Sequence, residues 1–343
     1  MLASYFMGAD AQQKFELREE VPAVPGAGEV LVRVRACGVC GTDVHIYHGE
    51  EGSAPVNPPV VLGHEFSGEV AAIGEGVVSL KVGDHVAMDP NRYCGACRPC
   101  RMGKKQNCEH LFALGVNTNG GFEEYALCPA DQCFLVNPEL PFEAAAMAEP
   151  LACAIHGIDR AGIRPGQNVL VVGGGTIGLM MVQLARLSGA AKVVLSEPVK
   201  MRQEIGLQLG AAAVIDPIHE SIAERLQEIW GTPGADVVIE CVGRTFAVEQ
   251  AIAAAGPGAT VLLFSVPAPG STVPLPLMDV FKKELTIVGS IINPDTHQRA
   301  VDLINSGRME LMPLITHRFD LAHLEQAIQM QMSSESIKVM VTP

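Results

Sequence analysis

The sequence from residue 168 onward has a pattern that few folds can produce. Residues 168–172 read NVLVV, and such a short apolar run is typical of a strand buried on both faces of a sheet. The run leads directly into a glycine cluster and then into a helical stretch over residues 177–188. Glycines at this point allow a tight turn between strand and helix. The segment therefore predicts a strand–turn–helix unit of an α/β domain.

Short apolar runs and helical stretches continue to alternate after this unit. We expect strands at 192–195, 213–215, 236–240, 260–264 and 285–288, and helices near 220–229 and 246–255. Alternating strands and helices build a parallel sheet with helices on both faces. The middle of the chain is therefore predicted to be a doubly wound domain of the Rossmann type.

The segments on either side of this domain follow a different pattern. Residues 29–36 alternate apolar and polar side chains, which predicts a half-buried strand, and residues 60–73 and 83–88 are similar, with glycines at the bends. After about residue 291, helices are expected at 295–306 and 323–332, with a closing strand at 337–341. We therefore expect a mostly β domain formed by residues 1–152 and 291–343, with the Rossmann domain, residues 153–290, inserted in it.

Length and composition exclude several classes of protein. A chain of 343 residues with 48% hydrophobic and 18% charged residues suits two globular domains. The net charge of −14 disfavours nucleic acid, whose phosphates need a basic patch. We see no apolar run of about 18 residues that would span a membrane, and no signal peptide at the start. A cytoplasmic protein is the expectation.

The glycine cluster also predicts a binding site. Gly173, Gly175 and Gly178 form G-x-G-x-x-G, in which glycines let the backbone approach a pyrophosphate and the helix N-terminus supplies free N–H groups. Any glycine-rich turn can match this motif, but its place between a buried strand and a helix favours a dinucleotide site. Thr176 and Ile177, between the second and third glycines, are expected to contribute to it.

Two residues farther along bear on the choice of coenzyme. Glu197 follows the second strand, 22 residues beyond Gly175, where a carboxylate can accept hydrogen bonds from the adenosine ribose. It would repel the 2′-phosphate of NADP, so NAD is predicted. Arg202 is expected to lie over the adenine. The alternatives are a solvated loop glutamate and a surface arginine.

Four of the ten cysteines lie within fifteen residues of one another. Cys94, Cys97, Cys100 and Cys108 have the spacing C-x2-C-x2-C-x7-C, and four thiolates can close a tetrahedral zinc shell. This cysteine knuckle is predicted to hold a structural zinc with no position left for a substrate. An iron–sulfur cluster and disulfides are the alternatives.

A second group of residues suggests a reactive metal site. Cys40 opens the sequence CGTDVH, and His64 and Glu65 belong to GHE. A catalytic zinc needs about three protein ligands and one open position. Cys40 and His64 supply two of them, and Glu65 or Glu149 can supply a carboxylate. Taken singly, each of these residues is equally consistent with a packing or surface role.

These motifs together resemble the zinc-containing medium-chain alcohol dehydrogenases. The resemblance spans essentially the whole chain and includes GVCGTDVH, GHEFSGEV, the cysteine knuckle, GGFEEYA, AEPLACAIHG and VVGGGTIG. It implies a GroES-like catalytic domain and two zinc ions per chain. Where the best-known members have a second zinc cysteine, this chain has Glu149 and then Pro150, which is similar to the sorbitol (polyol) and threonine dehydrogenase branch.

By that resemblance, Cys40, His64 and Glu65 bind the catalytic zinc, and Glu149 binds it directly or through a water. Cys153 does not match the ligand position and is interpreted as a helix-packing residue. Asp43 is expected to hydrogen-bond to His64. Thr42 would accept the proton of the substrate hydroxyl and pass it through the nicotinamide ribose to His45.

The implied activity is hydride transfer between a secondary hydroxyl of a small polyol, phosphorylated or not, and NAD. Ile292 stands where sorbitol dehydrogenases have a substrate-binding arginine, which argues against sorbitol itself. L-threonine 3-dehydrogenase, butanediol or secondary-alcohol dehydrogenase, and a non-catalytic NAD-binding redox sensor are the alternatives. Relatives pair their nucleotide-domain sheets, so a homodimer or homotetramer is expected through the strand at 260–264 and the stretch 266–276.

Overall fold

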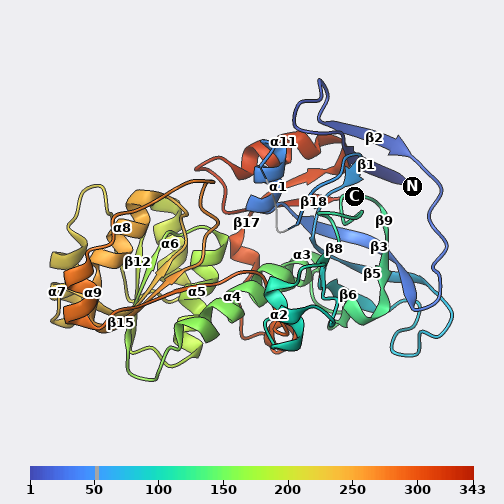
Figure 1. The fold of residues 1–343 in the computed structure, drawn as a ribbon. Coiled ribbons are helices and arrows are strands. Elements are labelled where there is room, and N and C mark those ends of the chain that lie inside the picture. Colours follow the sequence, from blue (N-terminus) through green and yellow to red (C-terminus); the bar gives the residue numbers. More distant parts are fainter. Residues whose placement is uncertain (51–53) are drawn as a thin grey trace. The chain divides into compact units, whose positions relative to one another are not determined.

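The computed structural model describes residues 1–50 and 54–343 (Figure 1). Contacts divide the chain into two compact units. The first unit contains Met1–Cys153 and Ile292–Pro343, and the second contains Ala154–Ile291. These limits lie one residue from the boundaries expected from the sequence. No helix of the described residues combines the length and apolar character needed to cross a membrane.

The second unit is built on a six-stranded sheet with the order β13-β12-β11-β14-β15-β16. Every neighbouring pair is parallel. Its strands are β11 (Asn168–Val172), β12 (Lys192–Ser196), β13 (Ala213–Ile215), β14 (Ala235–Glu240), β15 (Ala255–Leu263) and β16 (Thr286–Gly289). This strand order is that of a Rossmann domain, so the predicted fold class is confirmed.

Helices alternate with these strands and pack on the sheet (Figure 1). They are α5 (Thr176–Leu187), α6 (Lys200–Gln208), α7 (Ile222–Trp230), α8 (Thr245–Ala253) and α9 (Leu277–Lys283). Helix α4 (Ala148–Ala161) contains the boundary between the two units. The core of this unit is aliphatic, with Leu170, Val194 and Val238 fully buried on three adjacent strands. Fully buried strands explain why their sequences are continuously apolar.

The first unit is mostly β. Its strands are β1 (Leu2–Phe6), β2 (Phe15–Glu19), β3 (Glu29–Gly38), β4 (Val60–Val61), β5 (Glu65–Ile73), β6 (His85–Met88), β7 (Asn91–Arg92), β8 (Phe112–Ala113), β9 (Tyr125–Pro129), β10 (Cys133–Leu135), β17 (Ile315–Asp320) and β18 (Lys338–Thr342). Its helices are α1 (Gly41–Tyr47), α2 (Arg98–Arg101), α3 (Phe142–Ala146), α10 (His297–Asn305) and α11 (Leu324–Gln331). The largest sheet runs β10-β6-β5-β3-β18-β17, with β9 also paired to β3.

The pairing of β18 with β3 positions the candidate site. The two strands are antiparallel, with Val341 opposite Cys37 and Met340 opposite Gly38. β3 also pairs with β5, where Gly38 lies opposite Glu65. The last strand of the chain therefore lies beside the strand that leads into Cys40.

Residues 60–73 form two strands with a glycine bend between them, because the chain turns at Gly63, whose φ of +92° suits glycine. The structure corrects one expectation about strands. The strand expected at 260–264 cannot lie at the sheet edge proposed for subunit pairing. It belongs to β15, which is flanked by β14 and β16. The edge strand on this side of the sheet is β16, whose apolar run is indistinguishable in sequence from that of an internal strand.

Candidate active site

Cys40 is held at the start of α1. The Cys40 N–H donates to Oδ2 of Asp43 at 2.8 Å, so the carboxylate three residues into the helix satisfies a backbone group that the helix leaves free. Asp43 is fully buried. This short helix therefore fixes Cys40 between the end of β3 and the first turn.

His64 and Glu65 stand at the start of β5, directly after the turn at Gly63. A Cβ atom at Gly63 would lie 2.7 Å from the sulfur of Cys37, so the turn needs glycine for space as well as for its backbone angle. Both side chains are buried, with 6% of His64 and 2% of Glu65 exposed. The strand pairing directs them toward Cys40.

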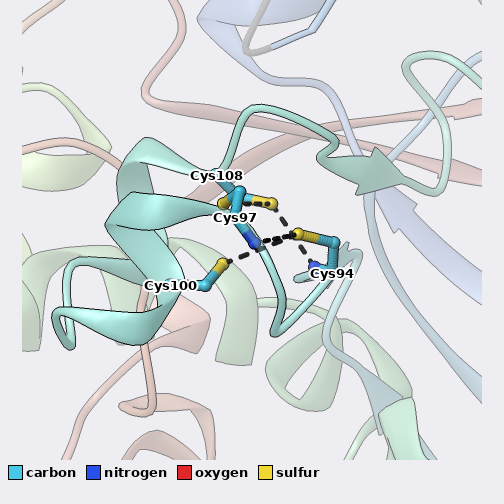
Figure 2. Close-up of side chains that lie close together, drawn as sticks. All are labelled: Cys94, Cys97, Cys100 and Cys108. Carbon is cyan, nitrogen blue, oxygen red and sulfur yellow. Dashed lines mark hydrogen bonds between the residues drawn. The ribbon is translucent and has the colours of Figure 1, made fainter.

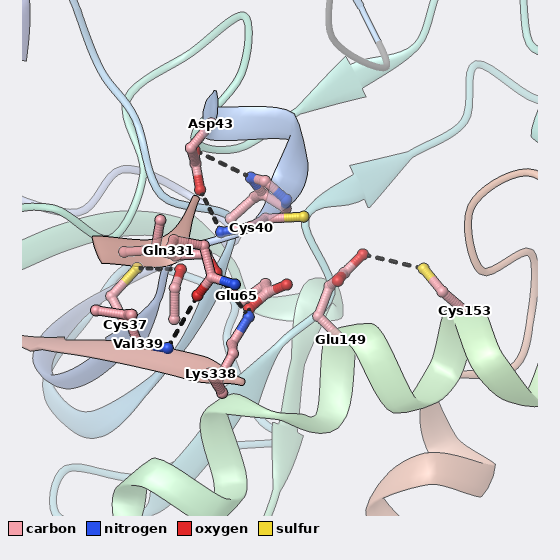
Figure 3. A network of polar contacts seen from close by, with 12 residues as sticks. Cys37, Cys40, Asp43, Glu65, Glu149, Cys153, Gln331, Lys338 and Val339 are labelled. Carbon is pink, nitrogen blue, oxygen red and sulfur yellow. Dashed lines mark hydrogen bonds and ion pairs between the residues drawn. The ribbon is translucent and has the colours of Figure 1, made fainter. Parts of the chain in front are cut away.

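Cys40, His64 and Glu65 form a compact group of ligand atoms. One ligand atom from each lies within 4.8 Å of the other two. A thiolate, an imidazole and a carboxylate are all accepted zinc ligands, and three of them leave a fourth position open. The residues therefore fit a catalytic zinc. Figure 3 shows Cys40 and Glu65 in this network, with the carboxylate of Asp43 joined to Cys40.

Lys338 is a partner of this group that the sequence analysis missed. Its ammonium forms an ion pair with Oε2 of Glu65 (Figure 3). It also donates to the carbonyl of Val39 at 2.9 Å. Only 2% of Lys338 is exposed, and a buried charge of this kind needs a partner. The available signal was a lysine at the start of the otherwise apolar strand at 337–341.

The relation between Asp43 and His64 differs from the prediction. Nδ1 of His64 lies 3.7 Å from Oδ1 of Asp43, and neither atom has a hydrogen-bond partner within the described chain. The predicted hydrogen bond is therefore wrong, because the two atoms are too far apart for one, while the Cys40 N–H donates to the other oxygen of Asp43. Burial would lower the pKa of His64, but the charges of Cys40 and Asp43 raise it. Asp43 thus acts on His64 as a nearby charge.

Glu149 lies in the first turn of α4, outside the compact group of Cys40, His64 and Glu65. Its Oε1 accepts a hydrogen bond from the thiol of Cys153 at 3.3 Å (Figure 3). Burial raises the pKa of Glu149 to about 7, and the charge of Glu65 adds to this effect. Cys153 is therefore more than a packing residue, since it orients Glu149.

Thr42 and His45 follow Cys40 in α1, and both are half-buried. The ring of His45 makes a close contact with the carboxylate of Glu50, another partner that the sequence analysis missed. The predicted proton path through Thr42 and His45 includes the coenzyme ribose, so these contacts do not test it.

The cysteine knuckle brings its four sulfur atoms together around α2 (Figure 2). The sulfurs of Cys94 and Cys100 are 4.0 Å apart, as are those of Cys97 and Cys108. Disulfides need about 2.05 Å, so the disulfide alternative is wrong and all four cysteines are free. Backbone N–H groups of Cys94 and Cys97 donate to sulfur at 3.3 Å, which stabilises thiolates. The knuckle therefore fits a closed zinc shell.

The second unit contains a pocket at the carboxyl ends of β11, β12 and β14. Gly173, Gly175, Glu197 and Arg202 line it, and Thr176, Ile177 and Gly178 lie in the adjoining first turn of α5, so their predicted role in coenzyme binding stays a prediction. The sequence analysis missed other lining residues, namely Pro217, Ile218, Cys241, Val242, Phe246 and Gln250. These residues come from neighbouring loops and α8, which parallel strands bring to the same edge of the sheet.

Glu197 is buried and holds the glycine turn in place. Its Oε2 accepts from the Gly174 N–H at 2.6 Å, and its Oε1 accepts from the Val199 N–H at 2.8 Å. Only 3% of the residue is exposed, which excludes the alternative of a solvated loop glutamate. The carboxylate therefore links the pyrophosphate-binding turn to the loop after β12.

Comparison with known proteins assigns the family. The family model of the alcohol dehydrogenase GroES-like domain matches residues 26–138, and that of the zinc-binding dehydrogenase domain matches residues 176–306. The chain belongs to the zinc-containing alcohol dehydrogenases. It is similar to L-threonine 3-dehydrogenase of Bacillus licheniformis, with 36% identity over 92% of this chain and 91% of the relative. It is also similar to D-xylulose reductase A of Aspergillus oryzae, with 35% identity over 96% and 93%.

Solved structures of relatives agree with this assignment. A zinc-binding dehydrogenase of Sinorhizobium meliloti 1021 bound to NADP has a TM-score of 0.93 and 38% identity, covering 99% of both chains. An alcohol dehydrogenase of E. coli CFT073 complexed with NADH has a TM-score of 0.90 and 31% identity, covering 100% of this chain and 99% of the other. The predicted membership of the polyol and threonine branch is confirmed, as are dehydrogenase activity and the cofactors zinc and NAD.

Proposed function

We propose that this dehydrogenase oxidises a secondary hydroxyl of a small polyol to a ketone with NAD, and catalyses the reverse reduction. The substrate carbon gives a hydride to the nicotinamide, and its hydroxyl gives up a proton. The observation that carries the proposal is the compact group of Cys40, His64 and Glu65, with Glu149 in place of a further cysteine. The similarity to a D-xylulose reductase supports a polyol substrate.

In this proposal Cys40, His64 and Glu65 hold the catalytic zinc. Zinc bound there lowers the pKa of a coordinated hydroxyl, so an alkoxide becomes accessible near neutral pH. Glu149, oriented by the thiol of Cys153, completes the shell directly or through a water. Cys94, Cys97, Cys100 and Cys108 hold a second, structural zinc, so two zinc ions per chain are expected.

The chain's own side chains handle the proton and the coenzyme. Thr42 would accept the proton of the substrate hydroxyl, and His45 would release it to solvent, with the nicotinamide ribose of a bound coenzyme between them. Glu197 accepts hydrogen bonds from the adenosine ribose. Because a buried carboxylate at this point repels the 2′-phosphate, NAD should be preferred over NADP.

L-threonine is the second candidate substrate. The relatives named L-threonine 3-dehydrogenase are as similar to this chain as the xylulose reductase is. Simple secondary alcohols and butanediol are the remaining candidate substrates. A redox sensor that binds NAD without catalysis would reduce no NAD with any of them.

Metal analysis and NAD reduction test the proposal together. We expect two zinc ions per chain and NAD reduction with a polyol in a panel that also holds sugar phosphates, L-threonine and butan-2-ol. Cys40→Ser and His64→Ala should each abolish turnover, while the dissociation constant for NADH stays unchanged. Glu197→Ala should lower the preference for NAD over NADP. One zinc per chain, or wild-type rates in either zinc-ligand variant, would refute the catalytic assignment.

A further inference from the structure

The end of helix α1 brings Glu50 back to His45. Gly49 follows the helix with a φ of +83°, in the left-handed region that glycine adopts readily. Its N–H donates to the carbonyl of Ile46 at 3.0 Å, and the Glu50 N–H donates to the carbonyl of His45 at 2.9 Å. These two bonds form a Schellman motif, which satisfies carbonyls that a helix end leaves free. The backbone therefore places residue 50 beside residue 45.

The side chains of the two residues are in contact. An apolar contact frequently accompanies a Schellman motif, but here Oε2 of Glu50 contacts Nδ1 of His45. Within the described residues, Nε2 of His45 has no hydrogen-bond partner. The side chain of His45 is 27% exposed and that of Glu50 is 37% exposed. The pair therefore lies where a proton can pass between the protein and solvent.

The chemistry of a carboxylate determines which nitrogen of His45 carries the proton. An ionised carboxylate accepts hydrogen bonds and cannot donate one, so Nδ1 must be the protonated nitrogen of this contact. In a neutral ring, Nε2 then has the free lone pair. A buried aspartate sets the tautomer of the catalytic histidine in serine proteases in the same way.

We propose that Glu50 is a positioning residue, which holds one proton of His45 on Nδ1 and leaves Nε2 free to take up the proton that the substrate loses. This inference rests on the proposed function. Thr42 and His45 are three residues apart in α1, so they lie on neighbouring parts of one helix face. When Nε2 takes up the proton, the ring becomes positively charged. When Nε2 releases it to solvent, the ring is neutral again and Nδ1 has kept its own proton.

Nuclear magnetic resonance of isotope-labelled histidine measures the tautomer directly. The sample is the zinc-loaded chain with NADH at mildly alkaline pH, where an ordinary histidine is neutral. The signals of His45 are those that disappear in His45→Asn. We expect a protonated Nδ1 and an unprotonated Nε2 in the wild type. In Glu50→Gln the two tautomers should be mixed, because an amide can donate as well as accept.

The rate of NADH formation in a single turnover measures the consequence for the reaction, without a contribution from product release. The substrate is the member of the panel of polyols, sugar phosphates, L-threonine and butan-2-ol that the wild type oxidises fastest. Glu50→Gln should lower this rate by about tenfold or more, with KM within about twofold of the wild type. Glu50→Asp keeps a carboxylate. In the wild type and both variants, the rate should follow the fraction of His45 that is protonated on Nδ1.

A second carboxylate–histidine pair provides the matched control. Oδ1 of Asp320 lies 2.6 Å from Nδ1 of His323, and neither residue belongs to the candidate active site. Asp320→Asn should leave the signals of His45 unchanged and the rate within about twofold of the wild type. Zinc content, measured in every variant, should equal that of the wild type. Less zinc in Glu50→Gln would mean that Glu50 supports the metal site instead of His45.

The outcomes distinguish this inference from the proposed function. A wild-type chain that oxidises no member of the panel contradicts the proposed function, while the tautomer of His45 still shows whether Glu50 sets it. A wild-type His45 with its proton on Nε2, or an unchanged rate in Glu50→Gln, overturns only the role of Glu50. A higher KM with an unchanged rate would mean that Glu50 contributes to substrate binding.

Discussion

At the scale of single residues, the ion pair between Lys338 and Glu65 is the contact with the clearest energetic consequence. Both side chains are at most 3% exposed. Removing one member of a buried pair leaves the other charge unpaired, which costs about 3–5 kcal/mol. Lys338→Met should therefore lower the free energy of unfolding by about 3 kcal/mol. Adding Glu65→Gln should recover much of that loss.

Urea unfolding of the two single variants and the double variant measures this coupling. Lys81→Met serves as a control, because Lys81 is exposed and should change stability by no more than about 0.5 kcal/mol. Additive effects of the two substitutions would show that Lys338 and Glu65 do not stabilise one another.

Part of this site can be predicted from the sequence, and the rest depends on contacts between distant segments. Cys40, His64 and Glu65 are recognisable because their residue types and short motifs suit a metal. Lys338 is 273 residues from Glu65, and only the pairing of β18 with β3 brings the two together. Asp43 was predicted to hydrogen-bond to His64, but the distance of 3.7 Å between them depends on the exact geometry of the helix start, which the sequence does not specify.

At the scale of secondary-structure elements, glycine has two different roles in the turn from β11 into α5. Gly178 allows close packing, and Gly175 leaves space for the coenzyme. A Cβ atom at Gly178 would lie 1.8 Å from the carbonyl oxygen of Gly173, whereas one at Gly175 would meet no atom within 4 Å. Gly178→Ala must push α5 away from the strand and should cost about 3 kcal/mol of stability. Gly175→Ala should change stability by no more than about 0.5 kcal/mol but weaken NADH binding, because the methyl group obstructs the pyrophosphate.

Urea unfolding and fluorescence titration with NADH distinguish the two variants. Gly178→Ala should lower both the free energy of unfolding and the affinity for NADH. Gly175→Ala should lower only the affinity for NADH. Equal stability of the two variants would mean that α5 and β11 are not packed as closely as their backbones indicate.

Elements with a strong apolar pattern were predictable, and those without one were not. Strands β11 and β13 begin and end where the sequence placed them, because buried parallel strands are continuously apolar. Helix α6 was missed, since its sequence KMRQEIGLQ buries only Gln203 and Gly206 and has no apolar stripe.

At the scale of the whole molecule, the second unit presents features of a subunit interface. Strand β16 lies at the end of the six-stranded sheet, and an edge strand exposes unpaired backbone groups. Helix α9, which contacts β15 beside it, exposes Leu277 by 74%, Met278 by 61% and Phe281 by 79%. Exposed apolar side chains gathered in one helix are typical of a surface that is covered in an assembly.

We therefore predict that the chain forms a homo-oligomer through β16 and α9. Met278→Glu combined with Phe281→Glu would place two charges in the apolar centre of the interface, where their desolvation is costly. Light scattering should then give a molar mass of at most half that of the wild type. Val78→Glu is the matched control, because Val78 is 95% exposed and lies in the first unit. An unchanged mass in the double variant would exclude this surface, and a monomeric wild type would exclude the oligomer itself.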